Sequence, residues 1–144
     1  MDDRPQFNSR FIVGVEQIDR EHQQLFELAA RVYDGLGASG EEAKVASRAA
    51  VAELLAYTTT HFTSEERLME QAGYPELDAH RRQHGHLLTL ARDMEMRAEF
   101  GDRSLPVELS HFITRWLVDH IEASDKRFGE FVAAGKNSGQ AAAK

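Results

Sequence analysis

Apolar residues recur every three or four positions in four separate stretches of this chain. The first stretch follows Asp19, a favourable N-cap residue, and stops near Gly37, because glycine commonly follows a last helical turn. The second runs from about Glu41 to Ala72, and the third from about Glu76 to Glu99. The fourth has Pro106 in its first turn, where proline is tolerated, and continues to about residue 134. The pattern therefore predicts four amphipathic helices.

The links between these stretches are short, and no strand-like alternation interrupts them. We therefore expect an all-α, up-down-up-down four-helix bundle over residues 19–134. Residues 1–18 carry too many apolar side chains, among them Phe7 and Phe11, for a free tail, so we expect an N-terminal arm packed on the bundle. Residues 135–144 have the composition of a flexible tail.

Composition removes several classes of function. The 144 residues are one domain by default, and they contain no cysteine, which excludes disulfides, zinc–thiolate sites and iron–sulfur clusters. A net charge of −7 without a basic stripe argues against nucleic acid or a membrane surface as partner. No apolar run is long enough to span a bilayer, and the first residues lack the layout of a secretory signal. We therefore expect a cytoplasmic protein with neither nucleic acid nor a membrane as partner.

Seven histidines are many for a chain of this length. Five of them lie in or beside the apolar stripes of the four predicted helices: His22, His61, His80, His84 and His120. A lone histidine on an apolar face is usually an ordinary core residue. Five together are harder to explain in that way, because burying unpaired imidazoles costs desolvation energy. A shared metal would give every ring a partner.

The spacing of the donors supports some of them more than others. His80 and His84 are four residues apart, about 40° around a helix, so both rings can reach one ion. His61 and Glu65 have the same relation. Asp125 follows His120 by five residues, about 140° in an ideal helix. Asp125 would join them from the edge of its helix or through a local distortion, and on spacing alone a solvated aspartate stays an open interpretation.

Five imidazoles and two carboxylates are too many ligands for one tetrahedral zinc ion. They suit two first-row ions joined by bridging carboxylates. Donors that are all nitrogen or oxygen favour iron or manganese. The residues alone therefore favour a two-metal site inside a helical bundle.

Five motifs occur in chain order: residues 19–23 (DREHQ), 61–66 (HFTSEE), 74–75 (YP), 80–84 (HRRQH) and 116–125 (WLVDHIEASD). Together they resemble the hemerythrin family over roughly residues 11–132. Bacterial members of that family often carry a tryptophan in the arm, where this chain has Phe7 and Phe11.

The resemblance implies a non-haem centre of two iron ions, Fe²⁺ or Fe³⁺, with an oxo or hydroxo bridge. By this resemblance, His80, His84 and His120 would bind one iron, and His22 and His61 the other. Glu65 and Asp125 would bridge the two ions.

The implied function is reversible dioxygen binding for storage, delivery or sensing, without enzymatic turnover. Dioxygen would occupy the open position of the iron that has two histidines, with nitric oxide as an alternative ligand and an oxygen-requiring enzyme as a conceivable recipient. We expect four apolar neighbours of the ligands to wall this pocket: Phe62, Trp116, Leu117 and Ile121.

Two other functions stay open. A di-iron oxidase or peroxidase of the ferritin-like kind would use two Glu-x-x-His motifs, of which this chain has one, Glu108 to His111. A metal-dependent sensor or interaction module is the second alternative. We expect His86 and His111 to lie at the surface. The acidic neighbours of the ligands should be solvated: Glu21, Glu66 and Asp119.

Overall fold

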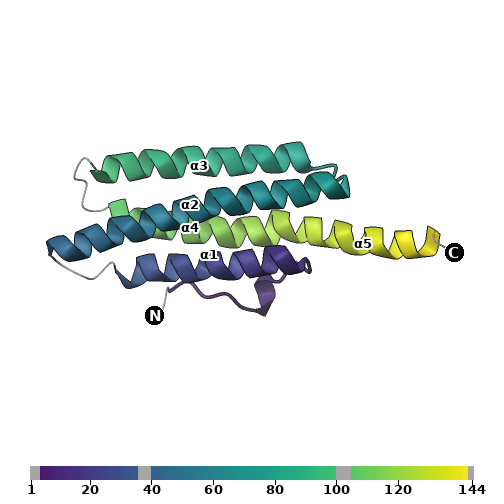
Figure 1. Ribbon diagram of the computed structural model, residues 1–144, viewed down its shortest axis with the longest axis horizontal. Helices are drawn as coiled ribbons and strands as arrows, with labels where there is room; N and C mark the ends of the chain where they lie inside the picture. Colours follow the sequence, from purple (N-terminus) through teal and green to yellow (C-terminus); the bar gives the residue numbers. More distant parts are fainter. Residues whose placement is uncertain (1–3, 36–39, 100–104, 143–144) are drawn as a thin grey trace.

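The computed structural model describes residues 4–35, 40–99 and 105–142, and within these ranges the chain is helical without any strand. Its elements are η1 (Ser9–Phe11), α1 (Glu16–Asp34), α2 (Glu41–Ala72), α3 (Leu77–Glu99), α4 (Leu105–His120), η2 (Ile121–Asp125) and α5 (Lys126–Ala142). Figure 1 shows α1, α2, α3 and the continuous rod of α4, η2 and α5 lying side by side. The all-α four-helix bundle is therefore confirmed. No described helix combines the length and apolarity that a membrane span requires.

The start of the first helix differs from the prediction. α1 begins at Glu16, so Asp19 lies inside its first turn and is not its N-cap. From there the Asp19 carboxylate accepts hydrogen bonds from the backbone N–H groups of Val13 (2.8 Å) and Gly14 (3.1 Å). Asp19 thus fixes the end of the arm. The helix ends at Asp34, and the predicted stop at residue 37 lies outside the described residues.

The fourth helix is longer and less regular than expected. Residues Ile121–Asp125 form one π-helical turn, η2, between α4 and α5. Beyond it the helical backbone continues to Ala142, past residue 135, where the sequence places the start of a flexible tail. Residues 135–139 (GKNSG) include two glycines and other weak helix formers, so helix propensity does not predict this continuation. In Figure 1, α5 extends beyond the ends of the neighbouring helices.

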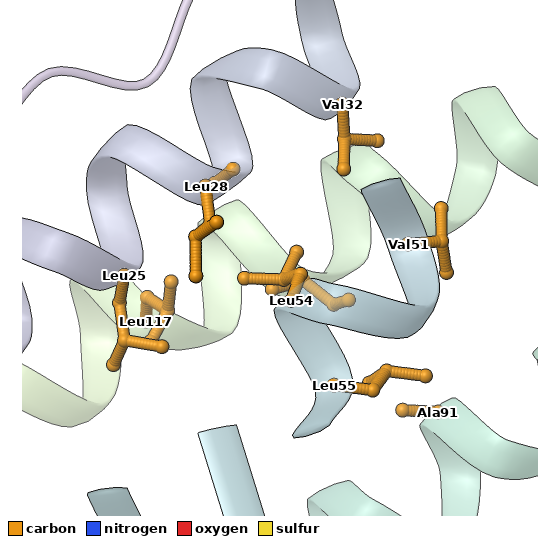
Figure 2. Packing of buried hydrophobic residues seen from close by; sticks show 10 residues of the cluster. Leu25, Leu28, Val32, Val51, Leu54, Leu55, Ala91 and Leu117 are labelled. Atoms are coloured by element: carbon orange, nitrogen blue, oxygen red, sulfur yellow. The ribbon is translucent and has the colours of Figure 1, made fainter. Parts of the chain in front are cut away.

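Two apolar clusters fill the core. Figure 2 shows the first, which contains Leu25, Leu28, Ala29, Val32, Val51, Leu54, Leu55, Ala91, Ile113 and Leu117. The second contains Phe11, Val13, Ile18, Phe26, Met69, Tyr74, Ile121 and Phe128. Leucine and isoleucine at three- and four-residue spacing bring these faces together, as the periodicity predicts.

The arm packs on the bundle through its two phenylalanines. The Phe11 ring stacks on Phe26 of α1 at 5.0 Å between centroids, and Phe7 meets the same ring edge-on at 5.9 Å. Phe11 is buried. Without an arm tryptophan, this chain therefore seals the outside of α1 with a small aromatic cluster.

Candidate metal centre

The seven predicted donors converge between the helices, and none is more than 7% exposed. Each of the four helices of the bundle supplies at least one of them. The donors are His22 from α1, His61 and Glu65 from α2, His80 and His84 from α3, His120 from α4 and Asp125 from η2. The structure therefore brings together every side chain that the sequence analysis selected, although metal binding by them stays a prediction.

The donors form two groups that share Glu65 and Asp125. The larger group contains three imidazoles, those of His80, His84 and His120. The Nε2 atom of His80 lies 2.6 Å from Glu65 Oε1 and 2.9 Å from Asp125 Oδ1. His84 Nε2 is 3.2 Å from the same Glu65 oxygen. His120 Nε2 is 3.1 Å from the same Asp125 oxygen. One oxygen of each carboxylate thus faces this group.

The smaller group contains two imidazoles, those of His22 and His61. They face the second oxygen of each shared carboxylate. His22 Nε2 lies 3.0 Å from Asp125 Oδ2 and 3.6 Å from Glu65 Oε2. His61 Nε2 is 3.3 Å from Glu65 Oε2. In each group the donor atoms all lie within 4.8 Å of one another. The two groups therefore share both carboxylates, each of which presents one oxygen to either side.

Asp125 reaches the site because of the π turn. In an ideal α-helix it would lie about 140° around the axis from His120. Over Ile121–Asp125 the turn is wider, and the Lys126 N–H donates to the carbonyl of Ile121, five residues earlier. A π turn holds more residues than the 3.6 of an α-helical turn, so it rotates Asp125 back toward the side of His120. Of the two routes that the sequence analysis left open for Asp125, the structure shows the local distortion.

Several polar atoms at this centre have no hydrogen-bond partner. Among the described residues, the buried side-chain atoms without one are His22 Nδ1 and Nε2, Glu65 Oε2, and Asp125 Oδ1 and Oδ2. Burying such atoms unpaired costs on the order of 1–3 kcal/mol each. Four of the five point into the space that the two groups share, and nitrogen and carboxylate oxygen are common donors to first-row metals. The residues present therefore fit a pair of metal ions.

Glu21 and Glu66 were expected to be solvated, and this prediction is wrong. Glu21 Oε1 lies 2.6 Å from His61 Nδ1, and Glu66 Oε2 lies 2.8 Å from His84 Nδ1. Because a carboxylate only accepts, both imidazoles donate through Nδ1 and turn Nε2 toward the centre. Ser64 Oγ also donates to Glu21, at 2.9 Å. Sequence spacing could not reveal the contact between Glu21 and His61, since the two residues lie on different helices.

Charge compensation shifts the pKa values of these groups. Burial lowers the pKa of His61, but the neighbouring carboxylates of Glu21 and Glu65 outweigh burial and raise it to about 10. The pKa of His80 rises to about 9 in the same way, through Asp125 and Glu65. Burial raises the pKa of Glu65, yet the surrounding imidazoles hold it well below its ordinary value. Without a metal, protons on the imidazoles neutralise the two buried carboxylates.

Of the four predicted pocket residues, two stack on donor rings and two belong to the apolar clusters. The Phe62 ring stacks on His84 at 3.7 Å between centroids, and Trp116 stacks on His120 at 4.2 Å. Both aromatic rings therefore lie against the larger donor group. Leu117 belongs to the first apolar cluster and Ile121 to the second. Their role as walls of an oxygen pocket stays a prediction.

The remaining acidic and histidine neighbours point away from the centre. His86, His111 and Asp119 are all exposed, as the sequence analysis expects. His111 belongs to the single Glu-x-x-His match, so that motif contributes no imidazole to the buried site. The buried donors are thus richer in histidine than in carboxylate.

Comparison with known proteins identifies relatives over most of the chain. A model of the Hemerythrin family, described as the hemerythrin HHE cation binding domain, matches residues 13–132. The bacteriohemerythrin of Stenotrophomonas maltophilia (strain R551-3) is 30% identical over 125 residues, which cover 87% of this chain and 79% of that protein. The bacteriohemerythrin of Methylococcus capsulatus (strain Bath) is 27% identical over 126 residues, 88% of this chain and 94% of that protein.

Solved structures give the same architecture. A wild-type hemerythrin structure superposes with a TM-score of 0.75 at 25% identity, covering 82% of this chain and 88% of that one. A point variant of hemerythrin superposes with a TM-score of 0.81 at 24% identity, covering 91% and 98%. The second match bears on the fold alone, and it shows that nearly the whole of that chain has a counterpart here.

Proposed function

This chain belongs to the hemerythrin family, and from that premise we propose that it binds dioxygen reversibly at a non-haem di-iron centre. In this proposal the centre is formed by the larger and smaller donor groups described above. The chain acts as an oxygen-binding protein rather than an enzyme. Storage, delivery to an oxygen-requiring enzyme and sensing would all use this chemistry.

The observation that carries the proposal is the sharing of Glu65 and Asp125. Each carboxylate turns one oxygen toward three imidazoles and the other toward two. Three of these four oxygens, Glu65 Oε2 and Asp125 Oδ1 and Oδ2, are buried without a hydrogen-bond partner, so hydrogen bonds to the imidazoles alone do not account for the arrangement. A pair of neighbouring cations explains the division, because each oxygen then serves one ion.

The two groups differ in the number of protein donors. The larger group offers five side chains and the smaller group four, with both carboxylates counted in each. When bound, two iron ions supply the electrons and the coordination position that dioxygen requires. The smaller group, His22 and His61, leaves more room around its ion, so we place the dioxygen site there.

The chain's own residues orient the donors and exclude water. Glu21 and Glu66 hold His61 and His84 by their Nδ1 atoms, which keeps each Nε2 directed inward. The rings of Phe62 and Trp116 cover His84 and His120 of the larger group, and the Phe62 ring centroid also lies 6.0 Å from that of His61 in the smaller group. A water-poor site protects a reactive oxygen ligand from protonation and release.

The donor set favours binding over oxidation. Ferritin-like di-iron sites take a glutamate from each of two helices and a Glu-x-x-His motif from each of the other two. Here five imidazoles accompany two carboxylates, and His111 of the one such motif is exposed. We therefore keep the oxidase or peroxidase as the less supported function.

Absorption spectroscopy of the iron-loaded protein tests the proposal. The reduced, oxygen-free protein should be colourless, air should produce a coloured form, and argon should restore the colourless one. Irreversible conversion to a ferric form with turnover of an added reductant would support the enzyme instead. Replacing air by nitric oxide shows which of the two gases binds reversibly.

A pair of histidine variants is the matched control. His61→Ala removes a donor of the smaller group and should abolish the reversible colour change. His86→Ala alters an exposed histidine on α3 and should leave it intact. Equal effects of the two substitutions would contradict the assignment of His61.

A further inference from the structure

The N-terminal arm touches α5 at Gly129 more closely than any side chain would permit. A Cβ atom at this position would lie 1.9 Å from the carbonyl oxygen of Val13 and 2.9 Å from its carbonyl carbon. The atoms that it would meet belong to the backbone, so a rotamer change cannot relieve the clash. Glycine at position 129 therefore allows the arm to cross the helix.

The same arm segment is held from its other side by α1. The N–H groups of Val13 and Gly14 donate to the two carboxylate oxygens of Asp19. Gly14 has a φ of 94°, a conformation that favours glycine. Val13 itself is buried. Backbone atoms of residues 13–14 are thus fixed between α1 and α5.

This crossing, the Val13–Gly129 joint, lies next to one edge of the candidate metal centre. Gly129 follows Asp125 by four residues and Asp19 precedes His22 by three, so each end of the joint is about one helical turn from a donor. Those two donors face each other, with His22 Nε2 3.0 Å from Asp125 Oδ2. The separation of α1 and α5 at the joint therefore bears directly on this pair.

A second tie connects the arm to the π turn. Arg10 Nε donates to Glu122 Oε1 at 2.6 Å, and Glu122 lies within η2. Both side chains are substantially exposed, so the ion pair is a weak constraint on the arm. Buried backbone contact at Gly129 is the stronger constraint.

We propose that the Val13–Gly129 joint is a positioning element of the smaller donor group. By fixing the spacing of α1 and α5, it sets the distance between His22 and Asp125 and so helps retain the ion held there. The proposal rests on the proposed metal function. It assigns to the arm a role in metal retention as well as in covering the core.

The test compares Gly129→Ala with Gly135→Ala, both in α5 of the full-length, iron(II)-loaded protein. A Cβ at Gly135 meets nothing within 4 Å, so that variant gains helix propensity without a clash. Hydrogen–deuterium exchange of residues 7–15 reports arm docking, and release of iron to a chelator reports retention. In Gly129→Ala we expect faster exchange in the arm and release of one of the two ions on the order of 10-fold faster, the other being less affected. Gly135→Ala should match the wild type in both measurements.

A loss of overall stability must be separated from loss of position. Val51→Ala removes buried volume from the first apolar cluster, away from the arm, and serves as the destabilised control. If Val51→Ala accelerates release of the same single ion as strongly as Gly129→Ala does, or if Gly129→Ala accelerates release of both ions equally, the joint is merely structural and the proposal is overturned.

A fourth variant, Asp19→Ala, tests the proposal if Gly129→Ala does not fold. Asp19→Ala frees Val13 and Gly14 from α1 without adding atoms to a tight contact, and the same selective loss is expected. If both ions are released at the wild-type rate although the arm is freed, the proposed role of the joint is wrong and the proposed function is unaffected. A wild-type protein that holds no metal would overturn the proposed function instead.

Discussion

The first apolar cluster and the metal centre lie on the same helices, yet their side chains are satisfied in different ways. On α2, Leu54 and Leu55 need only contact with neighbouring apolar groups (Figure 2), and those contacts are complete within the chain. About two to three turns further along the same helix, His61 and Glu65 are equally buried, but Glu65 Oε2 lacks a hydrogen-bond partner. Along α2, buried residues whose contacts are complete within the protein are therefore followed by a buried residue with a polar atom that lacks a partner.

This difference separates stability from function. Burial of leucine and isoleucine stabilises the bundle whether or not metal is present. Buried carboxylates and imidazoles cost desolvation energy, which protonation of the imidazoles offsets only in part. Substitutions in the two regions should therefore have separable effects, and the following experiments measure them.

The largest effect is expected from Glu65→Gln, which removes the charge that both donor groups share. The amide has nearly the same shape, so the bundle should fold, but neither ion should be retained. Metal analysis after gel filtration measures this. Glu70→Gln, five residues further along α2 at an exposed position, is the control and should retain both ions. Two retained ions in Glu65→Gln would show that the carboxylate is not a shared ligand.

The opposite combination, lower stability with unchanged metal content, is expected for Leu54→Ala in the apolar cluster. Leu54 is only 1% exposed, so its truncation should lower the free energy of unfolding by about 2–5 kcal/mol. Iron content per folded chain should not change, because no donor atom moves. Chemical denaturation and metal analysis on one preparation check both values. Loss of metal at temperatures where the variant remains folded would mean that the two regions are not separable.

A smaller effect is expected from Glu21→Gln. This change keeps a side-chain oxygen near His61 but removes the charge that holds its Nδ1–H. We expect metal affinity to fall about 10-fold, the lower end of the range for outer partners of metal ligands. Glu27→Gln, at an exposed position of the same helix, should have no effect in the same competition titration. An unchanged affinity would leave Glu21 without a role in the site.

The smallest effect is a pH dependence of the metal-free protein. The pKa values of His61 and His80, about 10 and about 9, are raised from the ordinary 6.5. Their protonation therefore stabilises the folded chain fully below pH 6.5, and this contribution is lost as pH rises to 9–10. The lowered pKa of Glu65 acts only toward acid, where its contribution is lost as pH falls below its ordinary value of 4.5.

Thermal unfolding between pH 6.5 and 10 measures this dependence. The midpoint of the metal-free protein should fall across the range, in the direction set by the histidine pKa values. Stabilisation by added manganese(II), a redox-stable probe, should grow over the same range, because ligation needs neutral imidazoles. A metal-free midpoint that stays constant would contradict the raised pKa values.

Much of the fold follows from sequence periodicity. The range Glu41–Ala72 was predicted to the residue because a glycine precedes it and the Gly73-Tyr74-Pro75 turn ends it. The start of α1 was missed, since Asp19 as an N-cap and Asp19 as an acceptor inside the first turn look alike in sequence. The crossing of the arm at Gly129 also leaves no periodic pattern, because it depends on the approach of two distant segments.

The candidate site, like the fold, was predictable from the sequence only in part. His80 with His84, and His61 with Glu65, were found from spacing because an α-helix turns them to one side. Asp125 needed the resemblance to a family, since the π turn that brings it inward is a departure from regular spacing. Glu21 was missed because its partner lies on another helix. Local rules thus identify donors within one element but not partners between elements.

The most direct test of the central claim is anomalous X-ray diffraction from crystals of the iron-loaded protein. The account predicts two iron peaks about 3.5–4 Å apart, the usual separation in two-metal sites. One peak should lie among His80, His84 and His120, and the other between His22 and His61, with Glu65 and Asp125 touching both. A single peak, or two peaks that do not share these carboxylates, would contradict it.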